Sequence, residues 1–224
     1  MDSAPLLRAD GLAKSYRRGA ERVTALADVS FEIEAGELLV VTGPSGSGKT
    51  TLLNILAGWD RPDEGALRWA LPDADASAPD WRILAIAPQR LGLLAELSVA
   101  ENVELPLRLG GAGRGRPDPE PVESALAAFG LTHLAHRMPW EVSIGEQQRT
   151  ALARALVVTP RLLLADEPTG HQDAAWATGV MEGLRKSCAA GSTVLIATHD
   201  EEVIAQVPRR LDLHDGRLAS DGAA

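Results

Sequence analysis

The sequence predicts an α/β protein with a parallel β-sheet at its centre and a helical segment inserted into it. Short continuous apolar runs, typical of strands buried on both faces, lie at residues 83–87, 162–165 and 193–197. Helical patterns separate these runs, which indicates crossover connections between parallel strands. From residue 92 to about residue 158 the pattern is helical, broken by a Gly- and Pro-rich loop at 110–121, which predicts an all-helical insertion.

The bulk composition limits the class of protein. The 224 residues suffice for one α/β domain, and 45% hydrophobic with 24% charged residues is typical of a soluble globular protein. The net charge of −9 argues against a nucleic acid partner, because duplex binding requires a basic surface. No apolar run is long enough to span a bilayer, and residues 1–5 lack the pattern of a secretory leader. We therefore expect a cytoplasmic protein, unless a partner holds it at a membrane.

The N-terminal part predicts short strands followed by one helix. Apolar residues predict strands at 6–9 and 29–33, the second with strict alternation, and a third strand at 37–41. A helix is expected over 51–57, followed by a turn over 61–65.

Three further segments complete the expected chain. The polar, proline-punctuated stretch 71–80 predicts a surface loop. A strongly helical stretch covers 147–158 and follows Ser143 and Glu146, which fit the capping box S-x-x-E. The Asp-Gly pair at 215–216 predicts a terminal hairpin over 211–218.

A phosphate-binding loop connects the strand at 37–41 to the helix at 51–57. It matches G-x-x-x-x-G-K-[ST] with Gly43, Pro44, Ser45, Gly46, Ser47, Gly48, Lys49 and Thr50. Glycines let the backbone wind closely around a polyphosphate, and the helix N-terminus presents partial positive charge to it. Lys49 would reach the β- and γ-phosphates, and the Thr50 hydroxyl would ligate Mg²⁺. The sequence therefore predicts a nucleotide site.

Polar residues follow the buried strands at the positions where phosphate chemistry needs them. Asp166 is expected to orient the shell of the Mg²⁺ ion, and Glu167 to polarise a water for attack on the γ-phosphate. His199 is a candidate sensor of the γ-phosphate or a partner for Glu167. The Gln89 carbonyl oxygen can reach Mg²⁺ or the attacking water.

The capping box at Ser143 admits two interpretations. It is either only a well-formed helix start or a second anion site, in which the Ser143 hydroxyl and the Gly145 N–H bind a phosphate supplied by another molecule. The sequence alone does not favour either interpretation.

With these residues in order, the chain resembles the nucleotide-binding subunits of ATP-binding-cassette (ABC) transporters over nearly its whole length. Gln89 is similar to the Q-loop residue, residues 142–149 to the signature motif, and residues 161–168 to the second nucleotide motif with Glu167 as catalytic base. Residues 170–173 stand where the D-loop belongs, and His199 where the switch histidine belongs.

The resemblance implies a fold, ligands and partners. The fold would be a P-loop NTPase core with a parallel sheet, an N-terminal antiparallel β-subdomain and an inserted α-helical subdomain. Residues 1–224 would form one nucleotide-binding domain, with 1–88 and 159–224 as its core and 89–158 as its helical subdomain. ATP and Mg²⁺ would be the cofactors.

The resemblance also implies how ATP is held and used. Tyr16 would stack on adenine with Val23 nearby, and Thr51 would join the phosphate loop in binding. Two such subunits would pack head to tail, so that Ser143, Gly145 and Glu146 of one complete the ATP site of the other. Hydrolysis would power a separate membrane permease, and that permease would hold the chain at the inner face of the cell membrane. Leu91, Leu93 and Leu94 are expected to be exposed and to receive that permease.

Local strings resemble the subgroup that serves lipoprotein release, macrolide or peptide export and FtsE-type division systems. Departures from the family pattern put the turnover rate in doubt. Ile144 stands where a glycine is usual, and His171-Gln172 replaces the more usual Asn-Leu. The segment between Gly65 and Ile83 is shorter than usual.

Two other functions compete with transport. One is an ATP-gated regulatory clamp of FtsE type, which activates a membrane partner without moving a substrate and uses the same site residues. The other is a cytosolic P-loop kinase or GTPase, which is disfavoured by the signature helix and by the absence of an N-K-x-D-like segment.

Overall fold

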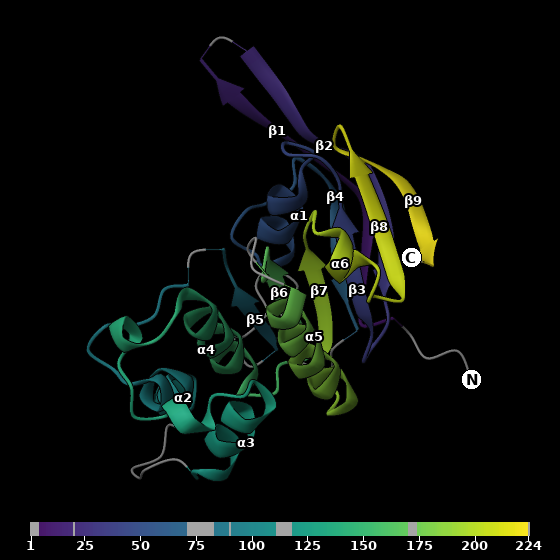
Figure 1. Cartoon of the computed structure of the whole chain (residues 1–224). Coiled ribbons are helices and arrows are strands. Elements are labelled where there is room, and N and C mark those ends of the chain that lie inside the picture. The colour runs from purple at the N-terminus through teal and green to yellow at the C-terminus, as the bar shows by residue number, and fades with distance from the viewer. Residues whose placement is uncertain are drawn as a thin grey trace.

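The computed structural model describes residues 5–19, 21–70, 83–89, 91–110, 118–169 and 174–223. Its larger sheet has six strands in the order β5-β6-β7-β3-β8-β9 (Figure 1). All neighbouring strands are parallel except β8 and β9, which form an antiparallel hairpin. The strands are β3 (Leu38–Thr42), β5 (Leu84–Ala87), β6 (Leu162–Asp166), β7 (Thr193–Ala197), β8 (Arg209–His214) and β9 (Arg217–Ala223). The predicted α/β class and terminal hairpin are confirmed.

The smaller sheet is antiparallel and has three strands in the order β2-β1-β4. Its strands are β1 (Leu7–Arg18), β2 (Glu21–Ile33) and β4 (Glu64–Trp69). The expected short strands at 6–9 and 29–33 were therefore wrong in length. Register shifts interrupt the pairing of β1 with β2, so apolar residues do not alternate along the whole of each strand.

The predicted turn over 61–65 was wrong at its end, because β4 begins at Glu64. Gly65 is needed here for close approach rather than for a turn. A Cβ atom at this position would lie 2.3 Å from the carbonyl oxygen of Gly11 on β1. Glycine can mark such a close approach inside a strand as well as a bend, and the sequence does not separate the two cases.

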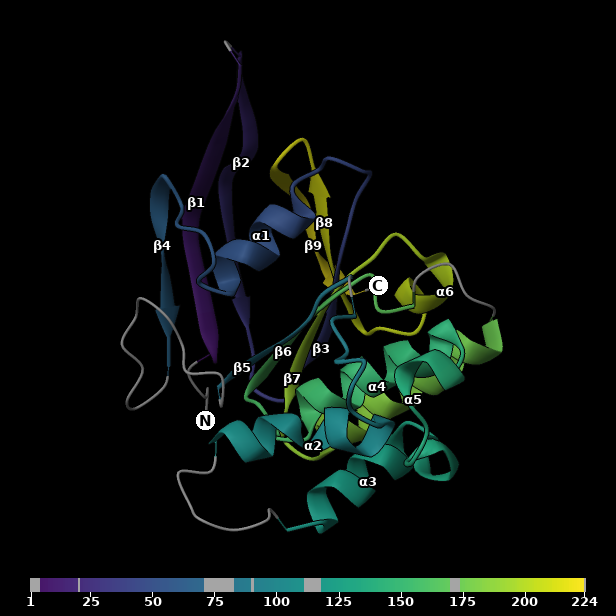
Figure 2. The same ribbon diagram turned by 90° about the vertical axis from the view of Figure 1, so that its left-hand side faces the viewer.

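Helix α1 (Lys49–Leu56) lies between the two sheets (Figure 2). Its buried Leu52, Leu53, Ile55 and Leu56 pack in one apolar cluster with residues of β1 and β2 and with one face of the larger sheet. Leu39 and Val41 of β3 belong to this cluster, whereas Leu38 and Val40 face the other side. This alternation follows from the period of two in a strand. The larger sheet is therefore covered on both faces.

The remaining helices cover the other face and the edge of the larger sheet. They are α2 (Val99–Gly110), α3 (Glu120–Ala128), α4 (Ile144–Leu156), α5 (Ala174–Ala189) and α6 (Glu201–Ile204), with 3₁₀ turns at Thr132–Leu134 and Pro139–Glu141. The expected helical start at residue 92 was wrong, because residues 91–98 are irregular. The expected loop at 110–121 is shorter, since α2 includes Gly110 and α3 starts at Glu120.

The surface around residues 91–94 also differs from expectation. Leu94 is 44% exposed, but Leu91 and Leu93 are only partly exposed. Arg154 on α4 explains part of this limited exposure, because it holds the segment against α4. Its guanidinium donates to the carbonyl oxygens of Leu91 and Gly92 at 2.8 and 2.7 Å. In the described part of the chain, no helix combines the length and apolarity needed to cross a membrane. The predicted loop at 71–80 and the D-loop at 170–173 lie outside the described residues.

Candidate functional site

The phosphate loop runs from the end of β3 to the start of α1, and its glycines are required by geometry. Gly43 has a φ of 140°, and a Cβ atom there would lie 2.0 Å from the carbonyl oxygen of Leu213. Gly48 has a φ of 107°, and its Cβ would lie 2.3 Å from the carbonyl oxygen of Ala25. Only glycine adopts these conformations at such close approach without strain.

The phosphate loop and the N-terminus of α1 form a suitable binding place for an anion. No side chain caps the N-terminus of α1 at Gly48, and no acidic residue lies in its first turn. The Lys49 ammonium donates to the carbonyl oxygens of Gly43 and Pro44 at 2.7 and 3.1 Å, which holds it at the loop. Free N–H groups, the helix dipole and this cation together favour a bound phosphate.

Asp166 at the end of β6 lies opposite Thr50 of α1. The Thr50 hydroxyl is 3.4 Å from the Asp166 carboxylate. Burial raises the pKa of Asp166, and the neighbouring Glu167 carboxylate raises it further, while Thr50 and Lys49 act in the opposite direction. A cation placed between Thr50 and Asp166 would relieve this unfavourable charge.

The donors here fit a hard cation such as Mg²⁺. Thr50, Asp166 and Gln89 line the same pocket and offer hydroxyl, carboxylate and amide oxygens. Among the described residues, no group of three or more His, Cys, Asp or Glu side chains could hold a metal ion by itself. An ion at this place would therefore need further oxygens, which nucleotide phosphates and water supply.

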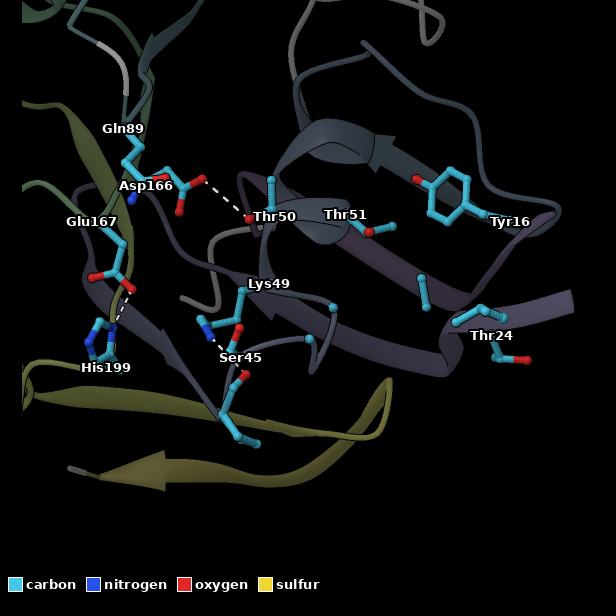
Figure 3. Close-up of a pocket in the computed structure, with 15 residues that line it drawn as sticks. Tyr16, Thr24, Ser45, Lys49, Thr50, Thr51, Gln89, Asp166, Glu167 and His199 are labelled. Atoms are coloured by element: carbon cyan, nitrogen blue, oxygen red, sulfur yellow. Dashed lines mark hydrogen bonds and ion pairs between the residues drawn. The ribbon is translucent and has the colours of Figure 1, made fainter. Parts of the chain in front are cut away.

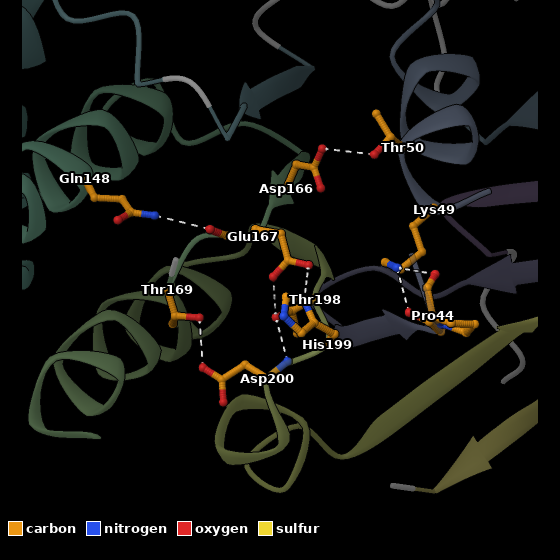
Figure 4. A network of polar contacts seen from close by, with 11 residues as sticks. Pro44, Lys49, Thr50, Gln148, Asp166, Glu167, Thr169, Thr198, His199 and Asp200 are labelled. Carbon is orange, nitrogen blue, oxygen red and sulfur yellow. Dashed lines mark hydrogen bonds and ion pairs between the residues drawn. The ribbon is translucent and has the colours of Figure 1, made fainter. Parts of the chain in front are cut away.

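Glu167 is held at all of its polar groups (Figure 4). Its carboxylate lies 2.7 Å from Nδ1 of His199 and accepts the hydroxyl of Thr198 at 2.8 Å. Its N–H donates to the carbonyl of Ala197 at 2.8 Å, and its own carbonyl accepts from the Gln148 side chain at 3.2 Å. The φ of Glu167 is 48°, a left-handed conformation that is costly for a non-glycine residue. These contacts fix the carboxylate at the strand end.

One pocket of about 540 Å³ joins these groups (Figure 3). It brings together most of the residues predicted for nucleotide binding and catalysis, and Figure 3 shows Tyr16 at the end away from Glu167 and His199. Its lining residues are Tyr16, Val23, Thr24, Ala25, Pro44, Ser45, Gly46, Gly48, Lys49, Thr50, Thr51, Gln89, Asp166, Glu167 and His199. Gly43 and Ser47 shape the loop but do not line the pocket. Ser143, Gly145 and Glu146 are absent from this lining.

Ser143 caps α4 as the sequence predicts. Its hydroxyl accepts from the Glu146 N–H at 3.3 Å, and the Glu146 carboxylate accepts from the Ser143 N–H at 2.7 Å. Burial acts to raise the pKa of Glu146, but the hydrogen bonds from Ser143, together with the nearby Arg149 and His133, outweigh it and the pKa is lowered. Ser143 and Ile144 are exposed at the start of α4, whereas Gly145, which was also predicted to bind a phosphate, is buried.

Ile144 is the first residue of α4 and is 66% exposed. It is not among the non-glycine residues with positive φ, so isoleucine fits the backbone and only adds side-chain bulk. The side chain at residue 144 therefore causes no backbone strain.

Besides Thr24 and Ala25, which line the pocket, sequence reasoning missed three side chains that contact residues of the site. Thr198 contacts the Glu167 carboxylate, and its place directly before His199 at the strand end could have indicated this contact from the sequence. Gln148 contacts the Glu167 carbonyl, and Asp60 contacts the Tyr16 hydroxyl. Neither contact leaves a local signal, because the partners lie far apart in the sequence.

The comparisons with known proteins agree with this geometry. The sequence profile of the family described as ABC transporter matches residues 26–170. The macrolide export ATP-binding/permease protein MacB 1 of Yersinia pestis bv. Antiqua (strain Antiqua) is 39% identical over 99% of this chain. MacB of Hyphomonas neptunium (strain ATCC 15444) is 38% identical over 97% of the chain. This chain spans 35% and 34% of the length of these two relatives.

Solved structures of ATP-binding cassettes share the fold. A dimeric post-hydrolysis state of the cassette MJ0796, bound to ADP and Pi, has a TM-score of 0.85 and 32% identity, covering 97% of this chain and 98% of that chain. The ADP conformation of MJ1267, an ATP-binding cassette of an ABC transporter, has a TM-score of 0.84 and 25% identity, covering 99% of this chain and 92% of that chain.

Proposed function

Because this chain belongs to the ABC transporter family, we propose that it binds ATP and hydrolyses it to power a membrane permease. The observation that carries the proposal is a single pocket that joins a phosphate loop to a fixed carboxylate, Glu167, beside His199. The loop supplies phosphate affinity, and the carboxylate supplies a base for water. These are the two requirements of phosphoanhydride hydrolysis.

The residues would act in the following way. Lys49 and the N–H groups of the loop bind the β- and γ-phosphates, and the Glu167 carboxylate accepts a proton from the attacking water. His199 holds the Glu167 carboxylate in place through the 2.7 Å contact. Thr50, Asp166 and Gln89 would hold Mg²⁺, which when bound neutralises charge on the phosphates.

We further propose that two copies, or one copy and a related subunit, are needed for the complete site. Ser143, Gly145 and Glu146 do not line the pocket of their own chain, and Ser143 is exposed. A helix N-terminus open to solvent can accept the γ-phosphate of a nucleotide held by another copy. The solved MJ0796 cassette with ADP and Pi is dimeric, which supports this arrangement.

The membrane partner is proposed by analogy. Both MacB relatives are named as ATP-binding/permease proteins, and this chain matches about a third of their length. We propose that a permease holds the chain at the inner face of the cell membrane. Export or release of a lipoprotein, peptide or drug is the proposed output.

We also propose that residues 1–88 and 159–224 form the nucleotide-binding core and that 89–158 form a helical subdomain. Helices α2, α3 and α4 all lie within 89–158, and every described strand of both sheets lies outside that range. The contact of Gln148 with the Glu167 carbonyl joins the two parts near the site.

Glu167→Gln tests the assignment of the base. The amide cannot take a proton from water, so we expect turnover to fall by about 10²- to 10⁴-fold while ATP binding is kept. ATP should then accumulate between two chains, and the variant should elute as a dimer when ATP is present. Steady-state phosphate release and size-exclusion chromatography measure the two effects.

The exposed Glu182 on α5, paired with Lys186 at 2.8 Å, provides a matched control. Glu182→Gln should keep wild-type turnover. Wild-type turnover in Glu167→Gln would show that another group is the base. Loss of ATP binding in that variant would show that Glu167 has a structural role.

A further inference from the structure

Tyr16 occupies the end of the nucleotide pocket that lies away from the catalytic carboxylate (Figure 3). Tyr16 is 40% exposed, and Val23 and Thr24 line the pocket near it. If the phosphates lie at Lys49, the base of the same nucleotide extends toward this end. An exposed aromatic ring is a suitable stacking surface for a purine.

Asp60 holds the outer edge of this ring. The Tyr16 hydroxyl donates to Oδ2 of Asp60 at 2.7 Å. The other carboxylate oxygen, Oδ1, accepts from the Lys14 ammonium and from the Arg61 N–H, both at 2.7 Å. The bonds from Lys14 and Tyr16 lower the pKa of Asp60, so it is a charged acceptor at neutral pH.

Lys14 restricts the ring from a second direction. Its ammonium lies over the Tyr16 ring, 5.4 Å from the centroid, and also donates to the carbonyl oxygen of Arg61 at 2.6 Å. Only 12% of the Lys14 side chain is exposed. A cation on one face leaves the other face of the ring for a planar ligand.

The Asp60 backbone is attached to the phosphate-binding helix. The N–H groups of Trp59 and Asp60 both donate to the carbonyl oxygen of Asn54 in the last turn of α1, at 2.9 and 3.1 Å. The first turn of the same helix begins at Lys49 in the phosphate loop. Asp60 therefore connects the element that binds phosphate to the side chain at the other end of the pocket.

We propose that Asp60 is a positioning residue that fixes the Tyr16 ring, through its hydroxyl, as a stacking surface for the purine base of the nucleotide. The inference rests on the proposed function, because it requires a nucleotide with its phosphates at Lys49. It adds a specificity role for Asp60: a ligand with a base gains affinity from the fixed ring, whereas a bare polyphosphate does not.

The test compares the affinity of the purified chain for ATP with its affinity for inorganic tripolyphosphate by calorimetry. Tyr16→Phe keeps the ring and removes the hydroxyl. Asp60→Asn keeps the volume but cannot accept bonds on both sides. Each change should weaken ATP binding by about two- to tenfold, the size expected for one lost hydrogen bond, and leave tripolyphosphate binding at its wild-type value.

Two further variants separate positioning from general support of the strand. Combining Tyr16→Phe with Asp60→Asn should weaken ATP binding no more than either change alone, because Asp60 acts through the hydroxyl. Asp10 lies on the same strand and accepts a hydrogen bond from the Arg8 side chain at 2.8 Å, and no contact found in the described residues joins it to Tyr16 or to Lys14. Asp10→Asn should keep the wild-type ratio of the two affinities.

The possible contrary results have different meanings. Additive losses in the double variant, equal losses for both ligands, or unchanged ATP affinity in the single variants would overturn the role of Asp60 alone. Equal affinity of the wild-type chain for ATP and tripolyphosphate would overturn both this role and the binding of a base at Tyr16. Absence of binding by either ligand would overturn the proposed function.

Discussion

Asp166 carries its charge at a position that disfavours it. Because burial and Glu167 raise its pKa in the folded chain, ionisation of Asp166 opposes folding. The cost is absent well below the ordinary pKa of an aspartate, appears as the pH rises, and is complete above the raised pKa. At neutral pH the charge therefore reduces the stability of the chain without ligands.

Asp166→Asn should raise the thermal unfolding midpoint at pH 7 in the absence of nucleotide and metal, because it removes this charge. A change of 1 kcal/mol moves the midpoint of a domain of this size by about 2–4 °C, so even a small gain is measurable. The gain should shrink as the pH is lowered. Calorimetry at several pH values gives both results, and the variant should also lose Mg²⁺-dependent ATP hydrolysis.

Asp212 is a control for this prediction, because its pKa is shifted in the opposite direction. Burial acts to raise its pKa, but bonds from Arg210, Thr42 and Ser220 outweigh this and the pKa is lowered. Its charge therefore stabilises the chain at neutral pH, and that stabilisation is lost as the pH falls. Asp212→Asn should lower the midpoint at pH 7. An equal shift of the same sign in both variants would contradict the account given for Asp166.

At the residue scale, the sequence predicts side chains that belong to a local motif. Asp166 and Glu167 lie at the end of β6, His199 lies two residues after β7, and Lys49 ends the loop that follows β3. Parallel strands bring these ends to one edge of a sheet. Asp60 and Tyr16 are separated by 44 positions and meet only because β1 packs near the end of α1. Such a contact depends on tertiary packing, which no local pattern encodes.

The phosphate loop, as an element, allows a prediction about stability. Gly48→Ala places a side chain at a φ of 107° and at 2.3 Å from a backbone carbonyl oxygen. Gly191 has a φ of 103°, with no heavy atom within 4 Å of the position of an added Cβ. Both alanines carry the backbone strain of about 1–2 kcal/mol, but only Gly48→Ala adds a steric clash.

Urea denaturation should therefore show a larger loss for Gly48→Ala than for Gly191→Ala. The difference between them measures how tightly the loop packs against Ala25. Equal losses would mean that the loop shifts to accommodate a side chain, and that close approach does not explain the glycine.

At the element scale, the sequence predicts the type of an element better than its ends. Apolar runs locate β5, β6 and β7 because both faces of these strands are buried. The hairpin of β1 and β2 extends to an exposed tip, where burial imposes no pattern. The expected helix at 147–158 starts earlier, at Ile144, directly after its cap at Ser143.

At the scale of the whole molecule, the role proposed for the exposed start of α4 predicts that activity depends on a second copy. Ile144 is 66% exposed next to Ser143 and would lie at the junction between copies. Ile144→Gly should raise ATPase activity at a given chain concentration, because the copies can approach more closely. Its cost in helix propensity is below about 1 kcal/mol, so folding should persist.

Leu109, on the last turn of α2 and 78% exposed, serves as the control. Leu109→Gly removes a similar exposed side chain from a helix end and should leave the concentration dependence of turnover unchanged. Unchanged activity in Ile144→Gly would show that its side chain does not limit the approach of a second copy.

Helix α1 lies between the two sheets and shares one apolar cluster with both. Neither sheet can melt alone without exposing the leucines that serve the other, so differential scanning calorimetry should record a single heat-absorption peak. ATP, which would engage the beginning of that helix, should then move the entire peak to higher temperature rather than split it.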